Sequence, residues 1–246
     1  MSNNLAIIAA GNNTRMNLGI PKPLVKINGK ENIVWLLENS YNYYDNIFIV
    51  IKHGEFYRYK YLESKFVNKL NFIEINSGKG DAHAILKFLE SVINTNISID
   101  DKLTIIWGDT FCPNDTIFKI INNCEVDNFI HVPLLLENNP YVYFTLDNCS
   151  FVTSAKFNKE NEVKFGYHDQ CIFYSKVGTF YSTINHYNIL KYKESSSTYN
   201  TSNNELKLIN MLNDFKYICK GLILKEDLGI RSFNNIQDLK KINYEI

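Results

Sequence analysis

The chain has 246 residues, with 26 Lys and Arg against 26 Asp and Glu, so its formal net charge at pH 7 is zero. This balance argues against a nucleic-acid-binding protein, which usually carries a basic face. No apolar run approaches the roughly 20 residues of a membrane span, and the N-terminus lacks the features of a signal peptide. The five cysteines are widely spaced and form no C-x-x-C pair, which is typical of a reducing compartment. We therefore expect a cytoplasmic protein with no nucleic-acid or membrane partner, and the sequence leaves its oligomeric state open.

The first half of the chain alternates apolar runs with segments of helical spacing. Buried strands are predicted at 5–10, 46–51, 72–75 and 103–107, and helices at 31–43, 55–69 and 81–92. Strands that are apolar throughout and separated by helices are typical of a parallel sheet covered on both faces.

The second half has a different pattern, with short β-like runs that follow one another without helices. These runs lie at 128–135, 141–146, 150–157, 162–165 and 171–175. Helices are predicted at 179–192, 204–213 and 236–241, a last strand at 217–224, and a mobile loop at 193–204. We expect an α/β fold with a single Rossmann-like mixed sheet, parallel in its N-terminal half with an antiparallel extension. One domain over 1–246, with halves at 1–125 and 126–246, is the simplest organisation.

The segment 7–24, IIAAGNNTRMNLGIPKPL, leaves the first predicted strand at its carboxyl end. Ligands of open α/β sheets bind outside the carboxyl ends of the strands. Gly11 allows a tight turn, and Asn12 and Asn13 tolerate positive φ better than most residues. Backbone N–H groups in such a turn can surround phosphate oxygens.

The same segment carries two cations and no acidic residue. The planar guanidinium of Arg15 suits a polyphosphate, and Lys22 adds a point charge whose backbone is restricted by Pro21 and Pro23. A strand-to-helix turn with solvated cations is the alternative, and the combination of turn glycine, two cations and two prolines disfavours it. Neither the G-x-G-x-x-G fingerprint nor the G-x-x-x-x-G-K-[ST] loop is present.

The motif AAGNNTRM…PKPLVKINGK resembles the signature of the sugar-nucleotidyltransferase superfamily, A-A-G-x-G-T-R-M followed by P-K-P-L and I-x-G-K. Asn13 replaces the second glycine of that signature. Three further stretches resemble family segments in the expected order: GKGDAHAIL (78–86), IIWGDT (105–110) and SFNNIQDL (232–239). The middle of the chain, about 110 to 200, matches only in outline, and acceptor specificity is set there in this family.

The resemblance implies a nucleotidyltransferase that joins a nucleoside monophosphate to a phosphorylated acceptor and releases pyrophosphate. Arg15 would then hold the β- and γ-phosphates, while Lys22 would neutralise the α-phosphate and the incoming phosphate. Asp109 follows a buried strand at the edge of the phosphate loop, where a carboxylate suits Mg²⁺ or Mn²⁺; a capping aspartate is the alternative. Asn234 would be the second metal ligand by resemblance, with a helix N-cap as its alternative role and Asp227 as its rival.

The resemblance also assigns residues around the two substrates. The nucleotide-binding set is Ala9, Ala10, Gly11, Asn12, Asn13, Asn76, Gly80 and Asp81, and the acceptor-binding set is Gly178, Thr179 and Glu205. Asp81 stands where the family commonly has Thr. Its carboxylate would accept from the cytosine amine and repel the O4 of uracil, which favours CTP; a carboxylate stabilised by the helix dipole is the alternative. His83 lies within a predicted helix, where a packed or hydrogen-bonded histidine is expected. His168 lies in the second half of the chain and is the better candidate for a histidine that acts in the reaction.

The expected substrates are therefore an NTP, with CTP favoured, and a small phosphorylated acceptor such as a sugar 1-phosphate or phosphocholine. The product would be an activated precursor for a capsule or another surface polysaccharide. A nucleotidyltransferase that uses UTP or another NTP is one alternative. A non-catalytic nucleotide sensor is another, although a sensor would be expected to lose Lys22 or Asp109.

Overall fold

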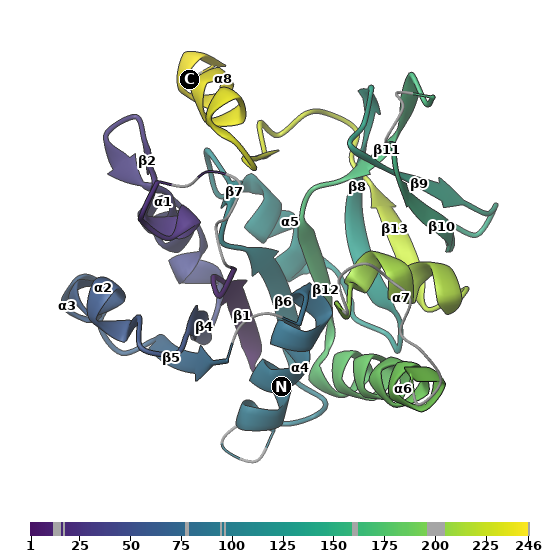
Figure 1. The fold of residues 1–246 in the computed structure, drawn as a ribbon, viewed down its shortest axis with the longest axis horizontal. Helices are drawn as coiled ribbons and strands as arrows, with labels where there is room; N and C mark the ends of the chain where they lie inside the picture. Colours follow the sequence, from purple (N-terminus) through teal and green to yellow (C-terminus); the bar gives the residue numbers. More distant parts are fainter. Residues whose placement is uncertain are drawn as a thin grey trace.

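The computed structural model describes residues 1–11, 16, 18–76, 79–93, 95, 97–158, 162–195 and 205–245. Within these ranges the core is one ten-stranded sheet with the order β10-β9-β11-β8-β12-β6-β1-β4-β5, and β13 pairs with β8 (Figure 1). Residues of both halves of the chain therefore share one hydrogen-bonded sheet. The expected α/β fold, with a mixed sheet, is confirmed.

The parallel half consists of β1 (Asn3–Ile8), β4 (Asn46–Lys52), β5 (Leu70–Ile75) and β6 (Lys102–Trp107). The chain steps outward from β1 to β4 and β5, then returns to place β6 on the other side of β1. The carboxyl ends of β1 and β6 therefore diverge at the point where the strand order reverses, which is where open α/β sheets bind ligands.

The antiparallel half begins where β12 (Ile172–Lys176) pairs with β6. The other strands are β8 (Ile130–Asn138), β9 (Val142–Leu146), β10 (Val152–Phe157) and β11 (Phe165–Asp169), and β13 (Cys219–Ile223) pairs with β8 in parallel. The strand predicted at 162–165 is wrong, since β11 begins only at Phe165. The amide side chain of Asn158 instead bonds both the N–H and the C=O of Val163, at 3.1 and 2.8 Å, and ties Val163 to the end of β10.

Helices cover both faces of the sheet (Figure 1). They are α1 (Asn32–Ser40), α2 (Phe56–Tyr59), α3 (Tyr61–Lys65), α4 (Asp81–Val92), α5 (Thr116–Asn123), α6 (Val177–Ser195), α7 (Leu208–Asp214) and α8 (Ile236–Glu245), with 3-10 turns at Lys22–Leu24 and Tyr41–Tyr43. The helix predicted at 55–69 is two short helices, α2 and α3, and α5 was not predicted. Of the loop predicted at 193–204, residues 193–195 continue α6 and the remainder lies outside the described residues.

Alternate residues of β1 face two separate apolar layers. Ala6 belongs to a cluster with the buried faces of α4, α6 and α7, whereas Leu5 and Ile7 pack with α1, α3 and α5. This alternation explains why the strand is apolar at every position from Leu5 to Ile8, because both of its faces are buried there.

Two short strand pairs complete the fold near the carboxyl edge of the parallel strands. They are β2 (Lys26–Ile27) with β3 (Lys30–Glu31), and β7 (Thr110–Phe111) with β14 (Arg231–Ser232). A third apolar cluster of Met16, Val25, Ile27, Phe111, Phe233 and Ile242 packs beside them. This cluster fastens the C-terminal segment to the loop that follows β1.

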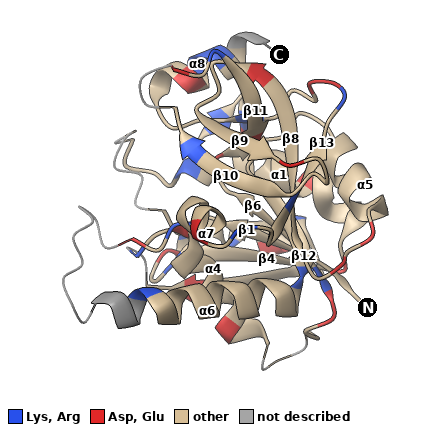
Figure 2. Ribbon diagram, turned by 90° about the vertical axis from the view of Figure 1, so that its right-hand side faces the viewer, with Lys and Arg blue, Asp and Glu red and all other residues tan. Residues whose placement is uncertain are grey.

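Charged residues of both signs are interspersed along the ribbon (Figure 2). Among the described residues, no helix combines the length and the apolar composition needed to cross a bilayer.

The segment that enters α7 is joined to the start of α4 through the backbone. The Leu206 N–H donates to the carbonyl of Lys79 at 2.7 Å, and the Ala82 N–H donates to the carbonyl of Leu206 at 3.1 Å. Gly80 makes this approach possible, because its φ is +94° and an added Cβ would lie 2.3 Å from the Leu206 oxygen.

We predict that Gly80→Ala destabilises the protein more than Gly54→Ala does. Gly54 has a similar φ of +81°, yet an added Cβ would meet nothing within 4 Å. Both variants bear the left-handed backbone cost of about 1–2 kcal/mol, and only Gly80→Ala adds a steric clash, which costs about 1–3 kcal/mol more. Urea denaturation measures both; equal losses in the free energy of unfolding would contradict the close approach of Leu206.

Candidate active site

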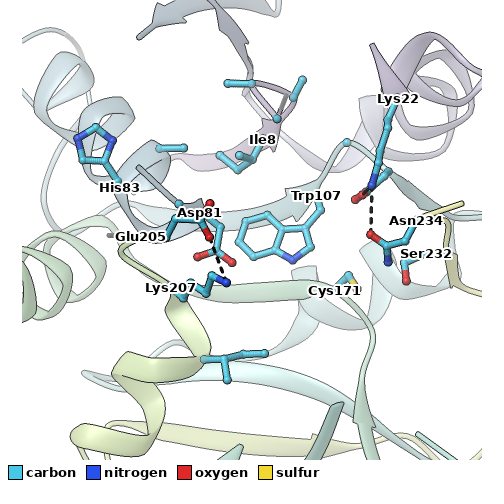
Figure 3. Close-up of a pocket in the computed structure, with 18 of the residues that line it drawn as sticks. Ile8, Lys22, Asp81, His83, Trp107, Cys171, Glu205, Lys207, Ser232 and Asn234 are labelled. Atoms are coloured by element: carbon cyan, nitrogen blue, oxygen red, sulfur yellow. Dashed lines mark hydrogen bonds and ion pairs between the residues drawn. The ribbon is translucent and has the colours of Figure 1, made fainter. Parts of the chain in front are cut away.

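A cavity of about 550 Å³ opens at the carboxyl ends of β1 and β6, between the parallel and antiparallel halves (Figure 3). The described members of the predicted nucleotide-binding set all line it, namely Ala9, Ala10, Gly11, Asn76, Gly80 and Asp81. Lys22, Asp109, Glu205 and Asn234 also line the cavity. Asn12, Asn13 and Arg15 lie outside the described residues.

Lys22 lies between the two predicted metal ligands. Its Nζ is 2.6 Å from Asp109 Oδ2 and 3.1 Å from Asn234 Oδ1 (Figure 3). The ammonium and carboxylate side chains are 17% and 22% exposed, so solvent screens this pair less than a surface ion pair. Three segments that are remote in sequence therefore meet around one positive charge.

The position of Lys22 follows from a tight turn packed against the end of β6. The Leu24 and Val25 N–H groups donate to the carbonyls of Pro21 and Lys22, both at 3.0 Å. Gly108 lies beneath this turn, and an added Cβ there would come within 2.6 Å of the Pro23 ring. The glycine before Asp109 thus allows the two loops to approach.

Asn234 is positioned by strand pairing on one side and by a helix cap on the other. The Phe233 N–H donates to the carbonyl of Asp109 at 3.1 Å, which continues the pairing of β14 with β7. Asp238 Oδ2 accepts from the Asn234 N–H at 2.8 Å and from the Asn235 N–H at 3.2 Å, while Asn235 Oδ1 accepts from the Asp238 N–H at 2.9 Å. These reciprocal bonds form a capping box at the start of α8. The cap is therefore Asn235, and the side chain of Asn234 remains directed at Lys22.

Asp227, the rival metal ligand, is engaged elsewhere. Its two carboxylate oxygens accept from the Arg231 guanidinium at 2.9 and 2.7 Å. This hydrogen bond lowers the pKa of Asp227, and the residue does not line the cavity.

The two oxygen atoms that contact Lys22 Nζ suit a hard divalent cation as ligands. A carboxylate oxygen and an amide oxygen converge on a single cationic group, and Mg²⁺ takes one or two protein oxygens together with water and phosphate oxygens. Among the described residues no cluster of three or more His, Cys, Asp or Glu side chains has metal-binding geometry. Asp109 and Asn234 therefore fit a metal that is shared with a phosphate ligand.

Asp81 lies at the opposite end of the cavity from Lys22, at the first residue of α4 (Figure 3). Its Oδ1 accepts from the Ala82 N–H at 2.7 Å and from the Leu208 N–H at 2.9 Å. Burial raises the pKa of this carboxyl even though both backbone bonds act in the opposite direction. One of its oxygens thus holds the start of α7 against α4.

The cavity wall includes residues that the sequence did not single out. The Trp107 ring lies between Asp81 and Cys171 (Figure 3), and Lys207 forms a 3.1 Å ion pair with Glu205. Trp107 ends β6 immediately before the Gly-Asp turn, so its place at the carboxyl end of a predicted strand was the available signal. Lys207 offered none, because it follows a polar stretch without periodicity.

His168 lies on the wall formed by β11, with Asp169 beside it. Its Nδ1 is 3.1 Å from Glu137 Oε2, and its Nε2 is 4.0 Å from Asp169 Oδ1. Burial acts to lower the pKa of His168, but the two carboxylates outweigh it and the pKa lies above its ordinary value. The antiparallel half thus contributes a histidine paired with two carboxylates to the cavity.

Gly178 and Thr179 do not lie along the cavity, and their expected place in the acceptor site is corrected. They begin α6 after β12, whose Lys176 pairs with Lys102 at the start of β6. That end of β6 is opposite the cavity. The Gly178 N–H donates to the carbonyl of Ile99 at 2.8 Å, so this glycine serves chain packing.

No protein-family model matches the chain. Over 115 residues, 46% of its length, the chain is 30% identical to the bifunctional protein GlmU of Thermosipho melanesiensis, and this match spans 23% of the length of that protein.

Solved structures resemble the whole chain. HddC from Yersinia pseudotuberculosis superposes with a TM-score of 0.70 at 19% identity, and the same protein complexed with GMP-PN gives 0.69 at 19%. The CTP:phosphocholine cytidylyltransferase LicC of Streptococcus pneumoniae gives 0.71 at 16% identity. Each comparison covers 100% of this chain and 99% of the other. The chain thus shares its fold with HddC and LicC.

Proposed function

We propose that this protein is a nucleotidyltransferase that transfers a nucleoside monophosphate, CMP from CTP, to the phosphate of a small acceptor. The convergence of Lys22, Asp109 and Asn234 in one cavity at the switch point of the sheet is the observation that carries this proposal. The fold shared with a cytidylyltransferase supports it.

In the proposed reaction an oxygen of the acceptor phosphate forms a bond to the α-phosphorus of the nucleotide. The bond from the α-phosphorus to the bridging oxygen breaks, and pyrophosphate leaves with the electron pair. The acceptor phosphate is already ionised near neutral pH, so the nucleophile requires no general base. The main barrier is repulsion between anions, which fixed positive charges reduce.

The residues of this chain are proposed to divide that task. Lys22 neutralises the α-phosphate and the incoming phosphate, and Arg15 holds the β- and γ-phosphates. Asp109 and Asn234 would bind Mg²⁺ or Mn²⁺, which supplies charge neutralisation at the phosphates. The Lys22 ammonium contacts the Asp109 and Asn234 oxygens that would bind the metal. It must therefore leave these oxygens for a phosphate when the substrates bind.

The acceptor is proposed to lie against the antiparallel half, where Glu205 and His168 line the cavity. The chain's length and the CTP preference proposed for Asp81 suit a CTP:phosphoglutamine cytidylyltransferase of capsular phosphoramidate synthesis, so phosphoglutamine is one acceptor to test. Phosphocholine and sugar 1-phosphates are the others. The proposed product is an activated precursor for a capsule or another surface polysaccharide.

Pyrophosphate release tests the proposal. The purified protein is mixed with Mg²⁺, each NTP in turn, and each of these acceptors. We expect release only when an NTP and an acceptor are both present, with CTP the best donor. Nucleotide binding without turnover on any acceptor would favour a nucleotide sensor instead.

Lys22→Ala is expected to lower kcat by about 10²-fold or more while the fold survives, because charged groups that act on the transition state have effects of this size. Lys26→Ala is the matched control, since Lys26 lies on the same segment and is exposed. Steady-state kinetics and thermal unfolding measure both. Normal turnover by folded Lys22→Ala would remove Lys22 from the mechanism.

Asp109→Asn is expected to raise the Mg²⁺ concentration needed for activity by at least about tenfold. Loss of a residue that only orients a metal ligand already lowers metal affinity by about tenfold or more, so loss of a ligand should cost at least as much. Asp227→Asn serves as the control, because Asp227 is bound to Arg231 outside the cavity. The measurement is a titration of activity with Mg²⁺. An Asp109→Asn enzyme with unchanged Mg²⁺ dependence would place the metal elsewhere.

Asp81→Thr is expected to reduce a CTP preference of about 5- to 150-fold in kcat/KM, the range that corresponds to one base contact of about 1–3 kcal/mol. Asp81→Asn separates the two roles of this residue. It keeps a carbonyl oxygen for the Ala82 and Leu208 N–H groups and presents an NH₂ donor that suits the O4 of uracil. An unchanged CTP/UTP ratio in both variants would mean that the base is read elsewhere.

A further inference from the structure

Asn32 is a fully buried polar residue at the first position of α1. Its side-chain Nδ2 donates to the Gly108 carbonyl at 2.9 Å and to the Thr110 carbonyl at 3.0 Å. Both partners are backbone acceptors, so the atom that faces them must be the amide nitrogen. The two carbonyls are those on either side of Asp109.

Packing alone does not explain an asparagine at this position. The residues that follow it on α1, Ile33, Val34, Leu36 and Leu37, are buried and apolar. The Oδ1 of Asn32 has no hydrogen-bond partner within the described part of the chain, and a buried polar atom in that condition costs stability. An aliphatic side chain would avoid this cost, so the two donated bonds are what the asparagine contributes.

Hydrogen bonds fix the backbone of the turn that carries Asp109, from Gly108 to Thr110. The Gly108 N–H donates to the Ile8 carbonyl at 2.9 Å, and the Asp109 carbonyl accepts from the Phe233 N–H at 3.1 Å. Asn32 satisfies the two remaining carbonyls, those of Gly108 and Thr110. The backbone is fixed while the Asp109 carboxylate is left to face Lys22.

Asn32 also links this turn to the loop that carries Lys22. Its backbone N–H donates to the Val25 carbonyl at 2.9 Å, and the Val25 N–H in turn bonds the Lys22 carbonyl. One residue thus ties both members of the Lys22–Asp109 pair to the start of α1.

We infer that Asn32 is a positioning residue that orients Asp109 for the divalent cation. This inference rests on the metal-binding role proposed above for Asp109. Partners that orient a metal ligand typically change metal affinity by about 10- to 100-fold when they are removed. The loss should fall on the contribution of the metal, because Asn32 is buried behind the turn and does not line the cavity.

Calorimetry tests this inference. The ligand is a non-hydrolysable CTP analogue in which a methylene group replaces the α,β-bridging oxygen. The ratio of its affinity with Mn²⁺ to its affinity with EDTA gives the metal enhancement of nucleotide binding. Asn32→Leu should reduce this ratio by about 10-fold or more and leave the affinity measured in EDTA unchanged. Asn39→Leu is the matched control, because Asn39 lies on the same helix and its Nδ2 donates to the Cys112 carbonyl at 2.9 Å, away from Asp109.

Asn32→Ser is the second variant if Asn32→Leu does not fold. Its hydroxyl can donate to only one of the two carbonyls, so its metal enhancement should be reduced by a smaller factor. A folded Asn32→Leu or Asn32→Ser protein with wild-type enhancement would overturn the inference. If Asp109→Asn also keeps wild-type enhancement, the proposed metal role fails with it. If only Asp109→Asn loses the metal enhancement of nucleotide binding, the metal role of Asp109 stands and the role of Asn32 is refuted.

Discussion

The close approach of two loops over Gly108 is the constraint on which the rest of the site depends. A side chain at this position would collide with the Pro23 ring, so only glycine lets the loop after β1 lie against the turn after β6. That approach brings Lys22 Nζ to 2.6 Å from the Asp109 carboxylate. The parallel pairing of β1 with β6 ends both strands at the same edge of the sheet, and the pairing of β7 with β14 adds Asn234 to the group.

The two ends of the cavity are built in different ways. At the Lys22 end, backbone pairing, a glycine contact and an apolar cluster hold the charged groups in place. At the Asp81 end, the segment that enters α7 is attached to the start of α4 by backbone bonds and by the Asp81 carboxylate. The residue proposed to contact the nucleotide base would therefore also anchor the segment that carries Glu205, which is proposed to contact the acceptor.

The parallel half was predictable because β1, β4 and β6 are buried on both faces and read as largely apolar runs. The contact between Lys22 and Asp109 was predictable because both residues lie in loops at the carboxyl ends of parallel strands. The helix α4 was predicted with its observed bounds. Asn234 rested on family resemblance, since nothing local relates it to Lys22. Gly178 was assigned by family resemblance alone, and β12 runs antiparallel to β6, so it carries Gly178 to the edge of the sheet that is opposite the cavity. Asn32 and Lys207 act through contacts that only the folded chain creates.

Anomalous diffraction from crystals grown with Mn²⁺ and a non-hydrolysable CTP analogue is the most direct test of the central claim, that Asp109 and Asn234 form the metal site of a nucleotide-binding cavity. The account predicts a manganese peak in contact with oxygens of Asp109, Asn234 and the nucleotide phosphates, with the Lys22 ammonium moved onto a phosphate. A peak at Asp227, or beside Asp169 and Glu137, with Lys22 still bound between Asp109 and Asn234, would contradict it.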